Sequence, residues 1–570
     1  MGEVDINRLR EKPFYLSEED VKWVQAAFGQ MTVQEKIGQL FFMVGYKQDE
    51  PFLKHIAQEI GIGGLMCRSM AKEEVVATVA TLQRSARIPL LIAANLEAGG
   101  QGITRDGTKI GSNMAIAATG SSDLAYQLGK ICAVEGGSVG ANYAFAPVVD
   151  IDYNFRNPIT NTRTFGSSPQ AVMEMGAAYV KGCQEQGMAA SVKHFPGDGV
   201  DERDQHLVTS VNSLTPEAWD DTYGMVYRHL IEEGAKTVMV GHIALPEYSK
   251  LLNPSLRDEE ILPASLASEL LDGLLRERLG FNGLIITDAT TMAGMNIPLP
   301  RNELVPRAIE NGCDMFLFTK NLEEDVRFMK EGLEAGLLSP GRLDDAVLRI
   351  LGLKASLKLH ERENIPVLAE SSAVLRQDSH LETARAVADQ SITLVKEEAG
   401  VLPLSPGRYP RVLLYDIESE ANALGYSKTN GLAAAFIPLL ENEGFKVTRF
   451  EPAGVYEGLQ SSFTEMKESY DLILYLCNLA TKSNQTSVRI EWLNPMGLNV
   501  PNYINSIPTL FISTENPYHL LDVPRVKTYI NTYGVNDYTL PQLLAKLMGR
   551  SQFTGKSPID PFCGKWDTRL

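Results

Sequence analysis

Eight short apolar runs, separated by longer amphipathic stretches, occupy residues 37 to 319 and constrain the fold more than any other feature of the sequence. Continuous apolar runs of this length are typical of strands that are buried on both faces of a parallel sheet. Eight β/α repeats within about 300 residues predict a (β/α)8 TIM barrel. The runs are IGQLFFMVGY from Ile37, GIGGLMC from Gly61, PLLIAAN from Pro89, NYAFAPVV from Asn142, MAASVKH from Met188, TVMVGHI from Thr237, GLIITD from Gly283 and CDMFLF from Cys313.

The segments between the runs are expected to be helical. The clearest helix covers residues 265 to 280, where Ser265 can act as the N-cap and Leu266, Leu270 and Leu274 form an apolar stripe. The gap from residue 96 to 141 is longer than one helix needs, so this repeat is expected to carry an elaborated loop.

A second α/β pattern follows the barrel. At 570 residues the chain is too long for one ordinary core, and we predict a barrel domain over 1–360, a polar linker over 361–385 and a C-terminal α/β sandwich domain with a mostly parallel sheet over 386–570. A helix is expected over residues 431–443. No GxGxxG or P-loop motif is present, so no nucleotide site is expected. The strand-like runs are RVLLYDI from Arg411, FKVTRFE from Phe445, DLILYLCN from Asp471 and TLFIST from Thr509.

Composition and charge exclude several classes of partner. The formal net charge of −18 argues against nucleic acid and against an anionic membrane surface. No stretch of about 18 apolar residues could span a membrane, and residues 1–15 contain no apolar segment typical of a signal peptide. The six cysteines are far apart, show no metal-ligand spacing and lie mostly in apolar runs, which predicts buried free thiols and a cytoplasmic location. No metal or organic cofactor is expected.

Functional groups of a TIM barrel gather at the C-terminal ends of its strands, so the polar residues that follow the apolar runs are the candidates for the functional site. The fifth run ends in Lys193 and His194, and a loop containing Asp204 and His206 follows. Two residues that are two positions apart face the same side of an extended backbone. The Asp204 carboxylate could then orient the His206 imidazole and favour its protonated form, as a general acid requires.

Two further groups follow other runs. Asp288 comes directly after a very apolar strand and would stand at the mouth of the barrel, where a retaining glycosidase needs an anionic nucleophile. Asn95, Glu97 and Arg163 offer the directional hydrogen bonds that sugar hydroxyls require. Each residue also has an ordinary interpretation: Asp288 as a cap or ion-pair partner, the Asp-x-His loop as a solvated turn, Lys193 and His194 as ion-pair partners, and Arg163 as structural. These residues alone leave the reaction open.

The loop KHFPGDGVDERDQH resembles the KHFPGHGxxxxDSH motif of glycoside hydrolase family 3, in its β-N-acetylglucosaminidase branch, without a gap. IPLLIAANLEAGG is similar to the family's PLLIxxDQEGG, and FAPVVDIDYNFRNPITNTRTFG is similar to its FAPVxDVxxNPxNPxIxxRSFG. The segment LPASLASELLDGLLRERLGFNGLIITDATTMAGM resembles the nucleophile segment, and ADQSITLVKEEAGVLPL from Ala388 resembles the opening of the family's C-terminal domain.

The resemblance implies a role for each matching residue. Asp288 becomes the nucleophile of a covalent glycosyl-enzyme, His206 the general acid/base, and Asp204 its positioning partner. The positions that match sugar-binding residues are Asn95, Arg105, Arg163, Lys193 and His194, and NLEAGG, which precedes Arg105, has one residue more than the family's motif. Three departures stand out: Asn95 replaces an Asp, Asp198 replaces the His of FPGHG, and Gln205 replaces the Ser of DSH.

The resulting hypothesis is a retaining exo-β-glycosidase that hydrolyses terminal β-linked N-acetylglucosamine and acts on small carbohydrates. Phosphorolysis and β-glucosidase activity on the same fold are alternatives, since Asn95 changes the sugar pocket and a neutral histidine would repel phosphate less than a carboxylate would. From other classes, a lyase could form a Schiff base through Lys193, and a non-catalytic sugar-binding protein could be built on a decayed enzyme. The sequence does not indicate the oligomeric state.

Overall fold

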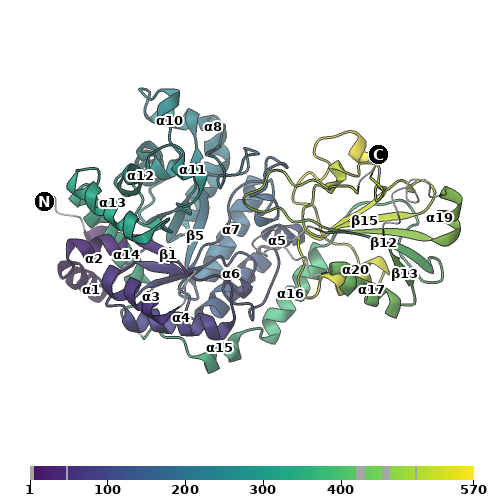
Figure 1. The fold of residues 1–570 in the computed structure, drawn as a ribbon, viewed down its shortest axis with the longest axis horizontal. Helices are drawn as coiled ribbons and strands as arrows, with labels where there is room; N and C mark the ends of the chain where they lie inside the picture. The colour runs from purple at the N-terminus through teal and green to yellow at the C-terminus, as the bar shows by residue number, and fades with distance from the viewer. Residues whose placement is uncertain (1–5, 46–48, 362, 419–430, 452–461, 494–496) are drawn as a thin grey trace. The chain divides into compact units, whose positions relative to one another are not determined.

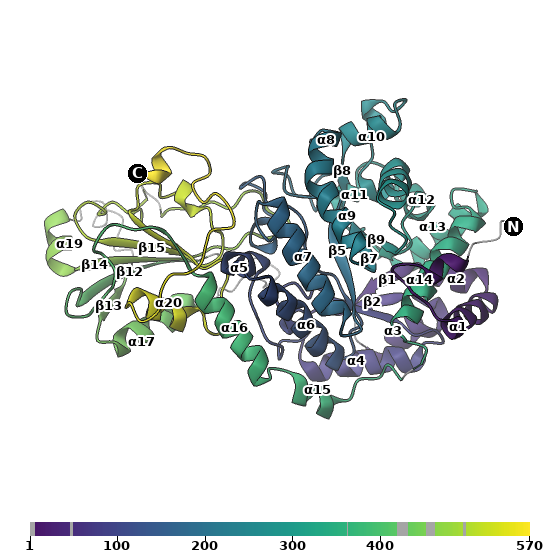
Figure 2. The same ribbon diagram turned by 180° about the vertical axis from the view of Figure 1, so that it is seen from behind.

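The computed structural model describes residues 6–45, 49–361, 363–418, 431–451, 462–493 and 497–570. Tyr46 of the first apolar run, residues 1–5 of the predicted barrel domain and residue 362 of the predicted linker lie outside the described residues. The chain forms two compact units (Figures 1 and 2). The first contains residues 1–109, 122–160 and 168–381; the second contains residues 110–121, 161–167 and 382–570.

The first unit is the predicted parallel barrel. Its eight strands hydrogen-bond in the order β10-β1-β2-β3-β4-β5-β7-β9, and a parallel bridge between Ile286 and Met315 links β9 to the start of β10. Each of the eight apolar runs contains one of these strands, and nearly every strand residue is buried, as the continuous apolar runs require. The strands are β1 (Phe41–Val44), β2 (Gly64–Met66), β3 (Leu91–Ala94), β4 (Tyr143–Ala144), β5 (Ala189–Phe195), β7 (Thr237–Val240), β9 (Leu284–Thr287) and β10 (Phe316–Leu317).

Helices surround these strands (Figure 2). Several begin at side-chain caps: Ser17 and Thr32 each form a reciprocal capping box at the start of α1 and α2, and Asn321 caps α13. The helices are α1 (Glu18–Gly29), α2 (Val33–Gln39), α3 (Glu50–His55), α4 (Lys72–Ser85), α6 (Ser122–Ser138), α7 (Pro169–Gln184), α8 (Pro216–Trp219), α9 (Met225–Glu232), α10 (Pro246–Leu252), α11 (Ala293–Asn296), α12 (Arg301–Glu310), α13 (Leu322–Glu334), α14 (Pro340–Ser356) and α15 (Leu368–Val374), with the short turns η1 (Ile6–Arg10), η2 (Ile56–Ile60), η3 (Gly100–Gly102), η5 (Asp220–Gly224) and η6 (Asp258–Glu260).

Two local expectations need correction. The segment expected to be one helix from Ser265 is a short turn, η7 (Ala264–Leu266), followed by a π-type helix, η8 (Glu269–Arg278). Ser265 is not a cap, because its hydroxyl forms a hydrogen bond with the His242 ring. A two-stranded parallel pair, β6 (Ser210–Val211) with β8 (Ile243–Ala244), was also not expected, since strands this short leave no periodic pattern.

The segment predicted as a linker, residues 361–385, carries α15 and the first part of α16 (Asp378–Ser391). Its polar sequence gave no helical signal, but α15 packs on α4 and α6, where the Ser371 hydroxyl donates to the Ser138 carbonyl at 2.6 Å. Tertiary contacts of this kind provide most of the stability of a short helix. The boundary between the two units falls at Leu381/Glu382, within α16.

The second unit is an α/β domain with a six-stranded sheet in the order β11-β16-β15-β14-β12-β13, parallel except for β11 against β16. The four expected strands and the helix expected over 431–443 are present; β11 and β16 were not expected, since both are short and mix polar with apolar residues. Helices α17 and α20 cover one face of the sheet (Figure 1), and the apolar core there includes Leu414, Leu474 and Ile512. The elements are β11 (Thr393–Lys396), β12 (Arg411–Glu418), β13 (Lys446–Arg449), β14 (Leu472–Asn478), β15 (Thr509–Ser513), β16 (Thr528–Asn531), α5 (Asn113–Thr119), α17 (Leu432–Asn442), α19 (Phe463–Ser469), α20 (Thr539–Leu547), η4 (Asn161–Arg163), η9 (His519–Leu521) and η10 (Asp567–Arg569).

No helix in the described part of the chain is both long enough and apolar enough to cross a membrane.

Candidate active site

The loop after β5 begins with a tight turn that only glycine allows. Gly197 and Gly199 have positive φ angles of 118° and 105°. A Cβ atom at Gly197 would overlap the Tyr223 ring, and one at Gly199 would overlap the Ile151 carbonyl. The turn therefore packs closely against the barrel and fixes the direction in which the rest of the loop leaves β5.

The structure brings Asp204 and His206 together at the far end of this loop. The Asp204 Oδ1 atom lies 2.7 Å from His206 Nδ1 and accepts the His206 backbone N–H at 2.8 Å. The backbone is a turn closed by the aspartate side chain rather than the extended loop expected from the spacing. Asp204 is fully buried, whereas 27% of the His206 side chain is exposed. Because the carboxylate faces Nδ1, Nε2 is the ring nitrogen that can face a substrate.

Asp288 follows β9 directly, at the C-terminal end of a barrel strand, where functional groups are expected. Its backbone N–H donates to Val240 in β7 at 2.7 Å, and its Oδ1 accepts the Ala289 N–H at 2.7 Å. Burial raises the pKa of the Asp288 carboxyl, but the neighbouring His194, His242 and His206 and the Ala289 N–H outweigh burial, so its pKa lies below the ordinary value. Asp288 is therefore a carboxylate at neutral pH, although it is almost enclosed by protein.

His194 lies beside this carboxylate, and a residue that was not predicted from the sequence, Asp150, orients it. The His194 Nε2 atom is 3.8 Å from Asp288 Oδ2, and its Nδ1 is 2.7 Å from Asp150 Oδ2. Asp150 is completely buried and also accepts the His194 backbone N–H at 3.1 Å. It follows the fourth apolar run directly, so the rule for barrel strand ends could have identified it.

His242, within the sixth apolar run and two residues beyond the end of β7, is a second residue that was not predicted. Its Nε2 lies 3.1 Å from the Ala289 carbonyl and its Nδ1 lies 2.8 Å from the Ser265 hydroxyl. Burial lowers the pKa of His242 to about 4, so the ring is neutral at neutral pH. Because Nε2 faces a carbonyl, it carries the proton, and Nδ1 accepts from Ser265. His242 thus supports the backbone next to Asp288 without adding a charge.

Lys193 joins the candidate sugar-binding residues of the third repeat. Its ammonium group is 2.7 Å from Glu97 Oε1 and 3.2 Å from Asn95 Oδ1. The Lys193 side chain is only 3% exposed, whereas Asn95 is exposed. The ammonium group therefore holds an amide and a carboxylate in place, an arrangement that suits hydroxyl recognition and is unfavourable for a Schiff-base lysine.

The two remaining candidates belong to other segments of the chain. Arg105 is exposed (68% of its side chain) and its guanidinium lies 3.8 Å from Glu74 at the start of α4. Arg163 belongs to the second compact unit, where the Asn113 amide donates to its carbonyl at 2.7 Å. The cluster built by the barrel strands thus contains Asp288, His194, Lys193, Asn95 and the Asp204–His206 loop.

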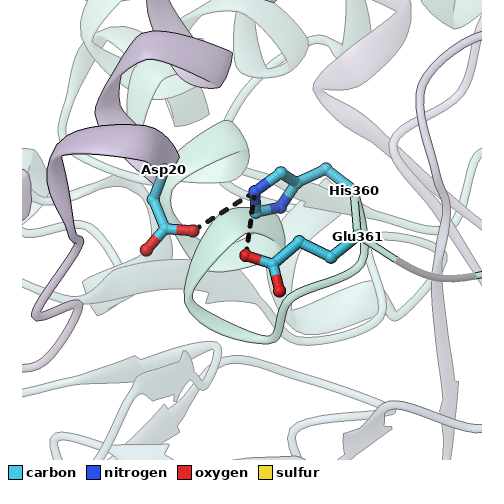
Figure 3. A group of neighbouring side chains, drawn as sticks. All are labelled: Asp20, His360 and Glu361. Carbon is cyan, nitrogen blue, oxygen red and sulfur yellow. Dashed lines mark ion pairs between the residues drawn. The ribbon is translucent and has the colours of Figure 1, made fainter.

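A separate group, Asp20, His360 and Glu361, has the donor types of a metal site (Figure 3). His360 Nε2 lies 3.2 Å from Asp20 and 3.6 Å from Glu361. However, the Lys358 ammonium binds both Asp20 oxygens, at 2.7 and 2.8 Å, and Glu361 at 3.1 Å. A lysine already occupies the position between these carboxylates, so the group is an ion-pair cluster that ties α1 to the segment after α14.

Comparison with known proteins identifies close relatives. The family pattern described as "Glycosyl hydrolase family 3 N terminal domain" matches residues 32–353. The chain is 53% identical over 562 residues to a Cellulomonas fimi protein named beta-N-acetylglucosaminidase/beta-glucosidase, covering 99% of this chain and 100% of that protein. It is 30% identical over 346 residues to beta-hexosaminidase A of Pseudoalteromonas piscicida, covering 57% of this chain and 56% of that protein.

Two solved structures are similar. "Beta-glucoside phosphorylase BglX bound to 2FGlc" is 44% identical, has a TM-score of 0.93, and the match covers 99% of this chain and 100% of that one. A β-N-acetylglucosaminidase from Paenibacillus sp. has a TM-score of 0.79 at 24% identity, with 94% of this chain and 100% of that chain covered, a likeness of fold.

Proposed function

Because the chain belongs to glycosyl hydrolase family 3, we propose that it is a retaining exo-β-glycosidase that removes terminal β-linked N-acetylglucosamine, with Asp288 as its nucleophile. One observation supports this proposal above the others: Asp288 is an almost enclosed carboxyl group whose pKa lies below the ordinary value, and one of the histidines near it, His206, is a partly exposed imidazole oriented by Asp204. A retaining glycosidase needs one anionic nucleophile and one proton donor.

In the first proposed step, an Asp288 oxygen bonds to the anomeric carbon while the bond from that carbon to the leaving oxygen breaks. Protonated His206 gives its Nε2 proton to the leaving oxygen, and Asp204 stabilises the imidazolium through Nδ1. In the second step, neutral His206 takes a proton from water, the water oxygen attacks the anomeric carbon, and Asp288 is released as a carboxylate. His194, held by Asp150, and Lys193, with Asn95 and Glu97, would bind sugar hydroxyls.

The nucleophile assignment is tested with Asp288→Ala. Turnover of aryl N-acetyl-β-glucosaminides should fall at least about 1000-fold, because no other group replaces the covalent step. The matched control is Asp258→Ala, since the Asp258 side chain is 83% exposed and pairs only with the surface residue Lys250. Substantial activity in Asp288→Ala would refute the assignment.

The role of His206 is tested with His206→Gln and two leaving groups. A dinitrophenyl leaving group departs without a proton, whereas an unsubstituted phenol needs one, so the variant should lose about 100-fold in kcat/KM on the phenyl glycoside and much less on the dinitrophenyl glycoside. Equal losses on both substrates would contradict an acid role.

Phosphorolysis is a second candidate, and the similarity to a structure titled beta-glucoside phosphorylase, at 44% identity over nearly the whole chain, favours it. A neutral imidazole, unlike a carboxylate base, does not repel a phosphate anion that approaches the glycosyl-enzyme. Release of sugar 1-phosphate in phosphate buffer, with free sugar alone in a phosphate-free buffer, would establish this reaction.

The choice of sugar is a separate question, because the relatives are named for both glucose and N-acetylglucosamine. Paired assays on aryl β-glucoside and N-acetyl-β-glucosaminide measure the preference directly. The reducing compartment expected from the cysteines leads us to propose the cytoplasm as the location, which cell fractionation with an antibody can test.

A further inference from the structure

Gln205, the residue next to the proposed acid/base, is completely buried. Its side chain links the segments that follow two strands of the barrel, β5 and β7. Its Oε1 accepts the backbone N–H of His242, at the end of β7, at 2.8 Å. Its Nε2 donates to Asp198 Oδ2, in the turn after β5, at 3.2 Å. Each end of the amide has one partner, so the side chain is fixed in a single orientation.

Asp198 is equally constrained. Its Oδ1 accepts the Asn157 amide at 2.8 Å and the Gly199 N–H at 2.7 Å. Its own backbone N–H donates at 2.8 Å to Asp150 Oδ1, the carboxylate that also orients His194. Both oxygens of the Asp198 carboxyl group therefore accept hydrogen bonds, and the one from Gln205 comes from the residue next to His206.

These contacts connect the acid/base loop to the nucleophile by two routes. From Asp198 the route passes through Asp150 and His194 to Asp288. From the other end of Gln205 it passes through His242 to the Ala289 carbonyl, directly after Asp288. A displacement of Gln205 would therefore move His206 relative to the Asp288 carboxylate.

Asp198 and Gln205 are also the two positions at which the loop departs from the motif that it resembles, and the two side chains contact each other. A paired departure in direct contact indicates that the residues depend on one another. We infer that Asp198 and Gln205 form a positioning pair that sets the distance and orientation of His206 relative to Asp288. This inference rests on the proposed function, in which His206 and Asp288 are the acid/base and the nucleophile.

Hydrogen bonds that do not involve the Gln205 side chain also hold the backbone of the loop at Gln205 and His206. The Ala293 and Gly294 N–H groups at the start of α11 donate to the His206 and Gln205 carbonyls at 3.0 and 3.2 Å. The backbone of the loop thus remains docked when the Gln205 side chain is changed, so that a variant there should misplace His206 rather than unfold the loop.

The test compares Gln205→Met, Asp198→Asn and their double variant on phenyl and dinitrophenyl N-acetyl-β-glucosaminides, or on the corresponding glucosides if those are the better substrates. Met removes both hydrogen bonds at similar volume, and Asn turns an acceptor into a donor that faces the Gln205 amide. We expect each single variant to lose about 10- to 100-fold in kcat/KM on the phenyl glycoside and less than about threefold on the dinitrophenyl glycoside.

The double variant should lose no more than the worse single variant, because the pair acts as one unit. Losses that are equal on the two substrates, or that multiply in the double variant, would overturn the inference. If Gln205→Met does not fold, Asp198→Asn alone decides by the same leaving-group comparison. His206→Gln separates the two proposals: if it discriminates between leaving groups and the pair variants do not, only the positioning role fails.

Discussion

At the level of single residues, the two buried histidines near Asp288 differ in what they face. His194 has a carboxylate, Asp150, on Nδ1, whereas His242 has only a hydroxyl and a carbonyl. A carboxylate favours the charged imidazole, while burial with neutral partners favours the neutral one. The site thus contains one histidine that a carboxylate orients beside the nucleophile and one that supports the backbone without charge.

This difference predicts how His242 titrates. Its pKa of about 4 in the folded protein lies below the ordinary value of 6.5, so between these values the unfolded chain binds a proton that the folded chain does not. Folding stability from this residue is therefore complete above pH 6.5 and decreases, by on the order of 3 kcal/mol, as the pH falls to 4. In the NMR spectrum of ¹⁵N-histidine-labelled protein, the signal that is lost in His242→Gln should remain that of a neutral ring at pH 5.5. A midpoint above pH 6 would contradict this.

The catalytic residues could be predicted from sequence only where their relation is local or their strand is obvious. Asp204 and His206 are two residues apart, and Asp288 ends a strand of continuous apolar residues. Asp150 directly follows the fourth apolar run and His242 lies near the end of the sixth, but their importance arises from contacts with residues 44 and 47 positions away in sequence, which no local pattern contains.

At the level of elements, the barrel strands could be predicted because burial on both faces leaves a continuous apolar run, while the helix expected from Ser265 could not, because a distant histidine binds that hydroxyl. The closing strand shows a similar long-range contact. Just before β10, Asp314 Oδ2 accepts the Ile285 N–H of β9 at 2.8 Å and the Arg276 guanidinium at 2.7 Å, both of which precede it in the chain.

Asp314 therefore carries a stability prediction. It is fully buried, and its Oδ1 pairs with Arg342 at 2.7 Å and lies 3.9 Å from Arg349. Asp314→Asn would remove the carboxylate that pairs with the buried Arg276 guanidinium and would leave Asp345 to pair with Arg342 and Arg349, so the free energy of unfolding of the barrel should fall by about 3–5 kcal/mol. The control Glu334→Gln removes an exposed partner of Lys330 and should change it by less than about 0.5 kcal/mol. Urea unfolding measures both, and equal midpoints would show that the arginines are not held by Asp314.

At the level of the whole molecule, the division into a barrel and a second α/β domain could be predicted from the alternation of apolar runs, but the assignment of two loops could not. Residues 110–121 and 161–167 precede or follow barrel strands in sequence and yet belong to the second unit. There the Asn536 amide donates to the Ile110 carbonyl at 2.7 Å, and the Asn161 amide donates to Asn516 at 3.1 Å. Contacts over hundreds of residues leave no trace in a local pattern.

The reactivity of the cysteine thiols tests the packing of both units in one measurement. Four are buried in the first unit and Cys477 is buried in β14 of the second, whereas Cys563 is partly exposed. Burial raises the pKa of Cys67 and of Cys132 to about 12, so these thiols are protonated at pH 8 and shielded from reagents as well. A chromogenic disulfide reagent at pH 8 should therefore label one thiol of the native protein within minutes and all six in denaturant.

Cys563→Ser should abolish the fast reaction and leave five thiols that react only on unfolding. Two or more fast thiols in the native wild type would mean that one of the apolar cores opens readily or is packed differently. Because rapid labelling of a core thiol requires the surrounding strands to separate, the slow rate of the five also reports how often either unit opens. A slow rate for all five would show that the close packing around these thiols, in the barrel unit and around β14 of the second unit, shields them from the reagent.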